Sequence, residues 1–149
     1  MRCNKSKKTI LAISLALSLL IVVTERYRFY RVRGESMYPT IEPYSFILVD
    51  RKAELSVSDI VVFELDNIIY VKRIVGCGGD TVSMIDGDLY VNGQLMHKNS
   101  SPESWNEEWK VPEGSLLLLG DNPSESIDSR FWCDPFVKET NVIGVVCLE

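Results

Sequence analysis

The amino-acid sequence predicts a mainly β protein: a compact antiparallel β-domain behind one N-terminal transmembrane helix. The first observation behind this prediction is an apolar run near the N-terminus, at residues 10–23. The second is a series of short segments after Gly34 that are rich in valine, isoleucine and aromatic residues, and the third is the set of turn residues between them. A chain of 149 residues is long enough for one compact domain but not comfortably for two.

The apolar run at 10–23 contains 14 residues, of which only two serines are polar. As a helix it is about 21 Å long, which is shorter than the roughly 30 Å of a bilayer core. Lysines before it and aromatic residues after it can extend its reach by lying at the two interfaces. A buried helix would carry a polar face, and a cleaved signal peptide would carry a small-residue site where this chain has Thr24-Glu25-Arg26. The run is therefore interpreted as an uncleaved membrane anchor.

Charge is distributed unevenly along the chain. The whole chain carries 16 basic and 21 acidic residues, and its net charge of −5 argues against a nucleic-acid partner. Residues 1–33 hold eight of the basic residues and one acidic residue, a net charge of +7, so the remainder carries −12. A basic head on an acidic body suggests that the head meets anionic lipid while the body faces water.

These features predict four parts in order along the chain. They are a basic tail at 1–8, a transmembrane anchor at 9–24, a juxtamembrane segment with the first strand at 25–33, and a β-domain at 34–149. Basic residues flank the anchor on both sides in nearly equal number, so the positive-inside rule alone does not determine its orientation.

After Gly34 the strand-forming segments follow one another with turns between them. We expect strands at residues 46–49, 60–65, 68–75, 82–85, 89–91, 116–119 and 142–148. Asp86-Gly87-Asp88 predicts a tight hairpin, and Asn92-Gly93 predicts another turn. Residues 101–110 are polar with two tryptophans, and are interpreted as a surface loop or short helix.

Lys72 is the candidate base. The single histidine, His97, lies in a polar stretch and is interpreted as a solvated loop residue, and with no CxxC pair we expect no metal and no cofactor. A lysine can act as a base where burial lowers its pKa, about 10.4 in water, by several units. Lys72 is the only lysine within an apolar strand-forming run, where alternation places Tyr70 and Ile74 on its face. The alternative is that Lys72 is an edge-strand charge that prevents aggregation.

Two polar segments accompany this lysine. Ser36 lies on a turn opened by Gly34 and stiffened by Pro39, so it is either an exposed nucleophile or simply a turn serine. Residues 120–130 form a dense polar loop directly after an apolar run. That loop is either a capped turn or the source of a hydroxyl that orients an amine and of an Asp–Arg pair that holds the loop.

In this order, behind an apolar anchor, the segments resemble the bacterial type I signal peptidases, membrane-anchored serine–lysine proteases, in their compact Gram-positive form. SMYPT at 36–40 resembles the family's nucleophile box, YVKRIVGCGGD at 70–80 its lysine box, and GDNPSESIDSR at 120–130 its last box. SDIV at 58–61 resembles a short G-D-x-V box, with serine in place of its glycine. The resemblance covers almost the whole chain.

The resemblance implies the β-domain fold of this family and a serine endopeptidase that removes N-terminal signal peptides from exported preproteins. Ser36 would be the nucleophile and Lys72 the general base. Ser126 would hydrogen-bond the Lys72 amine, and Asp128 and Arg130 would form a supporting ion pair. The backbone N–H of Ser36 would donate to the oxyanion.

The resemblance also implies how the enzyme binds its substrate and how it lies in the membrane. Substrate would bind as an added β-strand between residues 30–32 and 70–71. Val32 and Val71 would line a shallow pocket for small residues, beside Tyr70. The implied partners are preproteins that carry a signal peptide and the lipid bilayer, and no nucleic acid is expected. The enzyme would be a monomer. It would cross the cell membrane once, with a cytoplasmic N-terminus and an extracytoplasmic catalytic domain.

The chain departs from the family pattern at Gly78, where proline is common, and at Pro123, where arginine is common. Cys77, Cys133 and Cys147 are odd in number, so in an exported body at least one lacks an intrachain partner. Two other functions fit part of the pattern. One is a self-cleaving repressor-type serine–lysine protease, which carries a DNA-binding domain instead of an anchor. The other is a catalytically silent membrane-anchored binding module on the same scaffold.

Overall fold

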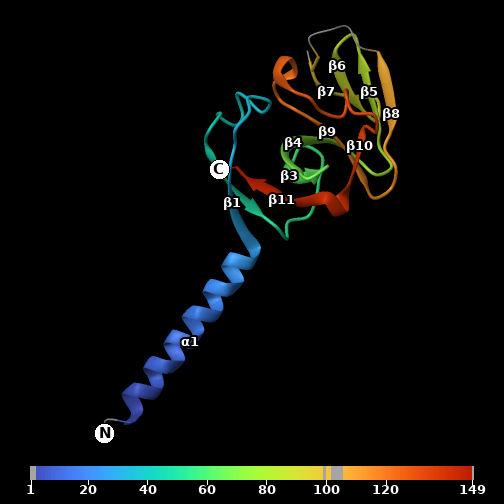
Figure 1. Cartoon of the computed structure of the whole chain (residues 1–149). Coiled ribbons are helices and arrows are strands. Elements are labelled where there is room, and N and C mark those ends of the chain that lie inside the picture. Colours follow the sequence, from blue (N-terminus) through green and yellow to red (C-terminus); the bar gives the residue numbers. More distant parts are fainter. Residues whose placement is uncertain (1–2, 99, 102–105, 149) are drawn as a thin grey trace.

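The computed structural model describes residues 3–98, 100–101 and 106–148. Helix α1 (Cys3–Arg26) leads directly into β1 (Tyr27–Arg31), which begins the larger of two sheets (Figure 1). The other strands of the larger sheet are β2 (Phe46–Asp50), β3 (Ile60–Leu65), β4 (Ile68–Cys77), β9 (Ser115–Leu119), β10 (Phe136–Lys138) and β11 (Val142–Cys147). The smaller sheet contains β5 (Thr81–Ile85), β6 (Asp88–Val91), β7 (Gln94–His97) and β8 (Glu107–Lys110). Short 3-10 turns, η1 (Pro123–Glu125) and η2 (Glu139–Asn141), lie in the C-terminal third.

Both sheets are antiparallel throughout their pairings. The strand order is β1-β2-β11-β3-β4-β9-β10 in the larger sheet and β7-β6-β5-β8 in the smaller one. The smaller sheet lies at the end of the domain that points away from α1 (Figure 1). The predicted fold class, one apolar N-terminal helix before a mainly antiparallel β-domain, is confirmed.

Helix α1 is longer than its apolar run. It has 24 residues, about 36 Å of helix at 1.5 Å per residue, because it continues through the polar residues on both sides of the run. The stretch Thr9–Arg26 is long and apolar enough to cross a membrane, and none of it is buried against the β-domain. The full 24-residue helix is therefore longer than the roughly 30 Å thickness of a bilayer core.

Contacts between Arg26 and the end of β2 join the helix to the β-domain. The Nε–H of Arg26 donates one hydrogen bond shared between the two carboxylate oxygens of Asp50, and Nη2 donates a second to Oδ2. Arg51 N also donates to Arg26 O at 2.8 Å. These hydrogen bonds and the ion pair hold the end of α1 to the end of β2, and they keep the pKa of Asp50 below its ordinary value. The last residue of α1 is thus tied both to β1, which follows it in the chain, and to β2.

Three clusters of buried apolar side chains form the core. The first lies under β1, β2 and the loop between them, and includes Met37 and Val62. The second joins the two sheets and includes Val82 and Leu117. The third lies on the other face of β3 and β4, and includes Phe63. The site described below lies between the first and third clusters.

Most of the expected strands form, and the differences have physical reasons. The prediction of a loop or short helix at 101–110 is wrong for Glu107–Lys110, which forms β8 and pairs with β5; residues 102–105 lie outside the described part of the chain. Trp109 lies opposite Val82 and packs against the second cluster, so one buried aromatic side chain holds an otherwise polar strand. Strands β7 and β10 were not expected, because neither short segment shows an apolar alternation.

The turns between strands follow the sequence signals. Asp86 and Gly87 have φ of 51° and 83°, and Asn92 and Gly93 have φ of 51° and 79°. Positive φ at both central residues is the geometry of the tight hairpin turn that these residue types favour. Both predicted turns, β5–β6 and β6–β7, are therefore confirmed.

Three other predictions concern the first strand, the histidine and the cysteines. The first strand was expected at 30–32 but spans Tyr27–Arg31, and Val32 follows it with its N–H donated to Ser45 O at 3.0 Å. His97 is exposed as expected, although it ends strand β7 rather than lying in a loop. Cys77, Cys133 and Cys147 are free thiols.

Candidate active site

The serine of the SMYPT segment lies in a tight turn between β1 and β2. Tyr38 N donates to Glu35 O at 3.0 Å, and Ile41 N donates to Met37 O at 2.8 Å. Met37 is 1% exposed and packs into the first core cluster. The buried methionine anchors the turn, and Ser36 is left half-buried beside it.

Lys72 lies in β4 and is 3% exposed. On one edge of β4, Val61 of β3 is opposite Lys72. On the other edge, β9 pairs with β4 only from Arg73 onward, opposite Leu119. The edge of β4 beside Lys72 is therefore approached by loops rather than by β9.

The structure brings Ser36 and Lys72 together. Lys72 Nζ lies 2.6 Å from Ser36 Oγ, within hydrogen-bond distance, although the residues are 36 positions apart in the chain. The two residues singled out from the sequence as nucleophile and base thus share one hydrogen bond. We call them the dyad below.

Burial lowers the pKa of Lys72 to about 8. Desolvation of the ammonium group is the largest cause. The negative charges of Asp128 and Asp121 oppose this change, and the positive charge of Arg130 adds to it. A pKa near 8 leaves part of the amine neutral near neutral pH, and a neutral amine can accept a proton from a hydroxyl group.

Asp128 organises the polar loop that follows β9. Its carboxylate accepts hydrogen bonds from Gly120 N at 2.9 Å, from Ser126 Oγ at 2.6 Å and from Arg130 Nη2 at 2.7 Å. The side chains of Asp128 and Arg130 are 0% and 1% exposed, so their ion pair is buried. The resemblance implied a hydrogen bond between Ser126 and the Lys72 amine, whereas the Ser126 hydroxyl donates to Asp128 in the structure.

Gly120 is the point at which this loop meets the serine turn. A Cβ atom on Gly120 would lie 2.6 Å from Ser36 O and would clash with the Ser126 hydroxyl. Asn122 reinforces the contact, since its N–H donates to Ser36 O at 2.9 Å and its Nδ2 donates to Glu35 O at 3.1 Å. The missing side chain therefore allows the backbone of the serine turn to be held against the loop.

Replacing Gly120 with alanine is expected to lower kcat/KM for cleavage by roughly a hundredfold, because a displacement of about 1 Å at a reacting group can have an effect of that size. The displaced groups would be the backbone of Ser36 and the side chain of Ser126. Steady-state cleavage by the full chain in detergent micelles measures the effect. Ser56→Ala is the control, because Ser56 is exposed and does not line the groove that leads to the dyad. An unchanged kcat/KM for Gly120→Ala would contradict this role.

A groove with a volume of about 580 Å³ leads to the dyad. It runs between the end of β1 and the first half of β4, and Ser36 and Lys72 lie among its lining residues. The other side chains predicted to bind substrate, Val32, Tyr70 and Val71, also line it. We call it the substrate groove.

Sequence reasoning missed a second ion pair beside the site. Arg73 donates from Nε and Nη2 to the two carboxylate oxygens of Asp121, at 2.8 Å and 2.6 Å. In the sequence, Arg73 directly follows Lys72 and Asp121 directly follows Gly120. The opposite charges of Arg73 and Asp121 could have indicated an ion pair, but the sequence offers many other combinations of one basic and one acidic residue. Which of them meet depends on the register in which β9 pairs with β4.

The arrangement can activate a nucleophile, because a serine hydroxyl next to a partly neutral amine can lose its proton to that amine. Among the described residues, no group of three or more His, Cys, Asp or Glu side chains is placed to hold a metal ion. An apolar helix long enough to cross a membrane, a groove and a serine hydroxyl hydrogen-bonded to a buried lysine are together typical of membrane-anchored hydrolases.

The comparisons with known proteins identify the family within that class. The chain belongs to the signal peptidase family, peptidase S26, whose model matches residues 5–148. It is 36% identical to signal peptidase I of Leptolyngbya laminosa over 92% of this chain and 74% of that protein. It is 32% identical to signal peptidase I S of Bacillus subtilis over 89% of this chain and 85% of that protein.

A solved structure supports the same assignment. The signal peptidase I from Enterococcus faecalis superposes with a TM-score of 0.54 at 29% identity, covering 64% of this chain and 98% of that one. The protein is therefore a hydrolase with signal peptidase I function. Within the part of the chain that the structure describes, α1 is the one helix long and apolar enough to cross a membrane.

Proposed function

We propose that the protein is a serine endopeptidase that removes N-terminal signal peptides from exported preproteins, with Ser36 as nucleophile and Lys72 as general base. The observation that carries the proposal is the 2.6 Å hydrogen bond between Lys72 Nζ and Ser36 Oγ, made by an amine whose pKa is about 8. The substrate class is taken from the relatives, which are named signal peptidase I.

The first half of the reaction forms an acyl-enzyme. Neutral Lys72 accepts the proton of the Ser36 hydroxyl as Oγ attacks the scissile carbonyl carbon, and the backbone N–H of Ser36 donates to the oxyanion. The tetrahedral intermediate collapses when Lys72 gives its proton to the nitrogen of the leaving chain. The mature protein leaves with a free amine, and the signal peptide remains as an ester on Ser36.

The second half hydrolyses that ester. A water molecule gives a proton to neutral Lys72 and attacks the ester carbonyl, and Lys72 then returns a proton to Ser36 Oγ as the signal peptide leaves as a carboxylic acid. The enzyme ends in its starting protonation state. Ser126, Asp128 and Arg130 serve as supporting residues, since their buried network holds the loop that contacts the serine turn.

The substrate groove is suited to a peptide in extended conformation. β1 is the first strand of its sheet, and β9 leaves the edge of β4 unpaired before Arg73. A peptide between these two edges can form main-chain hydrogen bonds as an added strand. Val32, 7% exposed, and the half-buried Val71 leave little depth beneath that peptide, which favours small side chains next to the scissile bond.

The short connection between α1 and the serine turn supports a position of this groove near the membrane surface. Only nine residues separate Arg26, the end of α1, from Ser36. We propose that residues 1–8 are cytoplasmic, that 9–24 cross the cell membrane and 25–33 join it to the catalytic domain, and that 34–149 act on the extracytoplasmic face. All proposed site residues come from one chain, which is consistent with a monomeric enzyme.

Cleavage of one preprotein by the full chain in detergent micelles tests the proposal. N-terminal sequencing should find one new N-terminus after a short side chain, and Ser36→Ala should lower kcat by at least roughly a thousandfold. Ser56→Ala, an exposed turn serine, is the matched control and should keep the wild-type rate. Wild-type enzyme that bound the preprotein without cutting it would instead support the silent binding module, and full activity of Ser36→Ala would refute the assigned nucleophile.

A further inference from the structure

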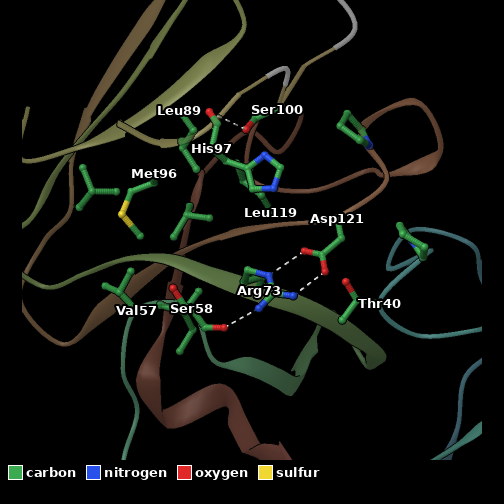
Figure 2. Close-up of a pocket in the computed structure, with 16 residues that line it drawn as sticks. Thr40, Val57, Ser58, Arg73, Leu89, Met96, His97, Ser100, Leu119 and Asp121 are labelled. Atoms are coloured by element: carbon green, nitrogen blue, oxygen red, sulfur yellow. Dashed lines mark hydrogen bonds and ion pairs between the residues drawn. The ribbon is translucent and has the colours of Figure 1, made fainter. Parts of the chain in front are cut away.

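A second pocket lies between the two sheets, separate from the substrate groove. Its volume is about 430 Å³, within the range of roughly 300–1,000 Å³ that is usual for binding pockets. Figure 2 shows Leu89, Met96 and His97 of strands β6 and β7 on one side and Arg73 with Ser58 on the other. We call it the intersheet pocket. Neither the dyad nor the side chains predicted to bind substrate line it.

The intersheet pocket continues the line of the substrate groove along β4. Residues 68–72 of β4 line the groove, and residues 73–75 line the pocket. The serine turn shows the same succession, since Ser36 and Met37 line the groove while Pro39 and Thr40 line the pocket. The dyad therefore lies at the junction of the two. A peptide that fills the groove up to Lys72 has its scissile bond at that junction.

The position of the anchor gives this line a direction. The groove begins at β1, which follows α1 without a linker. The strands β6 and β7 that form the upper wall of the pocket lie in the smaller sheet, on the side of the domain away from α1 (Figure 1). A signal peptide arrives from the membrane, and the polypeptide after the scissile bond belongs to the water-soluble product. The membrane-proximal groove thus suits the first part, and the distal pocket suits the second.

We propose that the intersheet pocket binds the first residues of the mature polypeptide, those that follow the scissile bond, in an extended conformation. This inference rests on the proposed function. It assigns a binding site to the leaving side of the substrate, with its walls supplied by β4 and by the β6–β7 hairpin. The continuity of the pocket with the substrate groove along β4 is the observation that selects this occupant.

The chemistry of the lining indicates which residues it accepts. Arg73 is already held by Asp121 and by Ser58 O, to which its Nη1 donates at 2.6 Å. The positive charge of Arg73 is therefore neutralised by Asp121 within the protein, and it offers little attraction to a charged side chain of the substrate. The opposite wall is apolar at Leu89 and Met96. We expect a preference for uncharged side chains of moderate size over charged ones.

Filling the pocket mouth tests the proposal. Met96 is 45% exposed and lines the pocket, so Met96→Trp narrows it without opening the core. Two substrates are compared that share one signal peptide and differ only beyond the scissile bond. The long one continues with several leucine and valine residues, and the short one ends with a single residue amide. The ratio of kcat/KM for the long over the short substrate should fall roughly tenfold in Met96→Trp, the effect of a modest change in a hydrophobic pocket.

The matched control is Leu95→Trp. Leu95 is also 45% exposed and precedes Met96 on β7, but it does not line the pocket. It should leave the ratio at the wild-type value. A ratio that stays unchanged in Met96→Trp, or that falls equally in Leu95→Trp, would overturn the inference while cleavage of the short substrate still supports the proposed function. Loss of cleavage of both substrates by the wild-type enzyme would overturn the proposed function itself.

Photocrosslinking directly locates the part of the substrate that follows the scissile bond. The long substrate carries a benzophenone amino acid at the second position after the scissile bond, and full-chain Ser36→Ala holds it uncut. Crosslinks on the β6–β7 hairpin, around Leu89 and Met96, are expected. Crosslinks confined to β1 would overturn the inference, because they would place the mature polypeptide on the membrane-proximal side.

Discussion

Replacing Lys72 with methionine is expected to abolish cleavage and, at neutral pH, to stabilise the fold. Cleavage is lost because methionine cannot accept the Ser36 proton, and kcat should fall by at least roughly a thousandfold. The fold gains stability because the protonated amine is held in a site where it is 3% exposed, and methionine fills a similar volume without a charge. Loss of a structural residue would lower both activity and stability, so the opposite signs identify a functional lysine.

The pH dependence of this effect follows from the pKa of Lys72, which is lowered from 10.5 to about 8. Below pH 8 the folded and unfolded states both bind the proton, and the folded state bears the full penalty, on the order of 3 kcal/mol at 1.36 kcal/mol per pKa unit. Between about pH 8 and 10.5 the unfolded state binds more protons, so the stability of the wild-type protein rises with pH. The advantage of Lys72→Met should therefore be complete at pH 7 and should vanish above pH 10.5.

Thermal unfolding of the full chain in micelles between pH 7 and 10 measures this difference. Lys138→Met, which replaces an exposed lysine, is the matched control and should leave unfolding unchanged at each pH. The activity of the wild-type enzyme should rise through about pH 8 as Lys72 loses its proton. A stability difference that does not change over this pH range, together with a flat activity profile, would contradict a proton-accepting role for Lys72.

Replacing Asp128 with asparagine is expected to destabilise the protein by about 3–5 kcal/mol, the usual consequence of leaving a buried charge without its partner. The charge left behind is that of Arg130, whose side chain is 1% exposed. The change also removes the carboxylate that accepts from Gly120 N and Ser126 Oγ. Activity should fall together with stability, since this loop holds the serine turn.

Denaturant unfolding of the full chain gives the free energy, and a double variant sharpens the test. Asp128→Asn with Arg130→Met removes both charges, and it should recover a large part of the lost stability, because replacing both partners of a buried pair costs far less than removing one. Asp134→Asn replaces an exposed carboxylate and should have a small effect. A loss of less than about 1 kcal/mol in Asp128→Asn would show that the buried pair is not what holds this loop.

Several features could be predicted from local sequence alone. The apolar run predicts α1 because it lacks charged residues and its flanking lysines and aromatic residues extend its reach toward the width of a bilayer. The turns at Asp86-Gly87 and Asn92-Gly93 follow from residue types that tolerate positive φ. The boxes around Ser36, Lys72 and residues 120–130 could be recognised in order, so the family was within reach before any fold was known.

Other features could not be predicted, because they depend on contacts between distant segments. Strand β8 exists because Trp109 reaches the second core cluster, and its four residues carry little strand signal of their own. The Arg73–Asp121 pair depends on the register in which β9 meets β4. The need for glycine at position 120 arises from the approach of Ser36 O, which lies in a different part of the chain.

The chain by itself thus determined the apolar helix, most of the strands and the chemical types of the site residues, since each of these depends on neighbours along the backbone. Only the tertiary structure decided that Lys72 Nζ lies 2.6 Å from Ser36 Oγ and that its pKa is about 8. The physical reason is that the pKa of Lys72 is lowered mainly by desolvation, and packing from several segments removes water from around its amine. The apolar run around Lys72 indicates burial, but its extent depends on segments that are distant in the sequence, such as the serine turn.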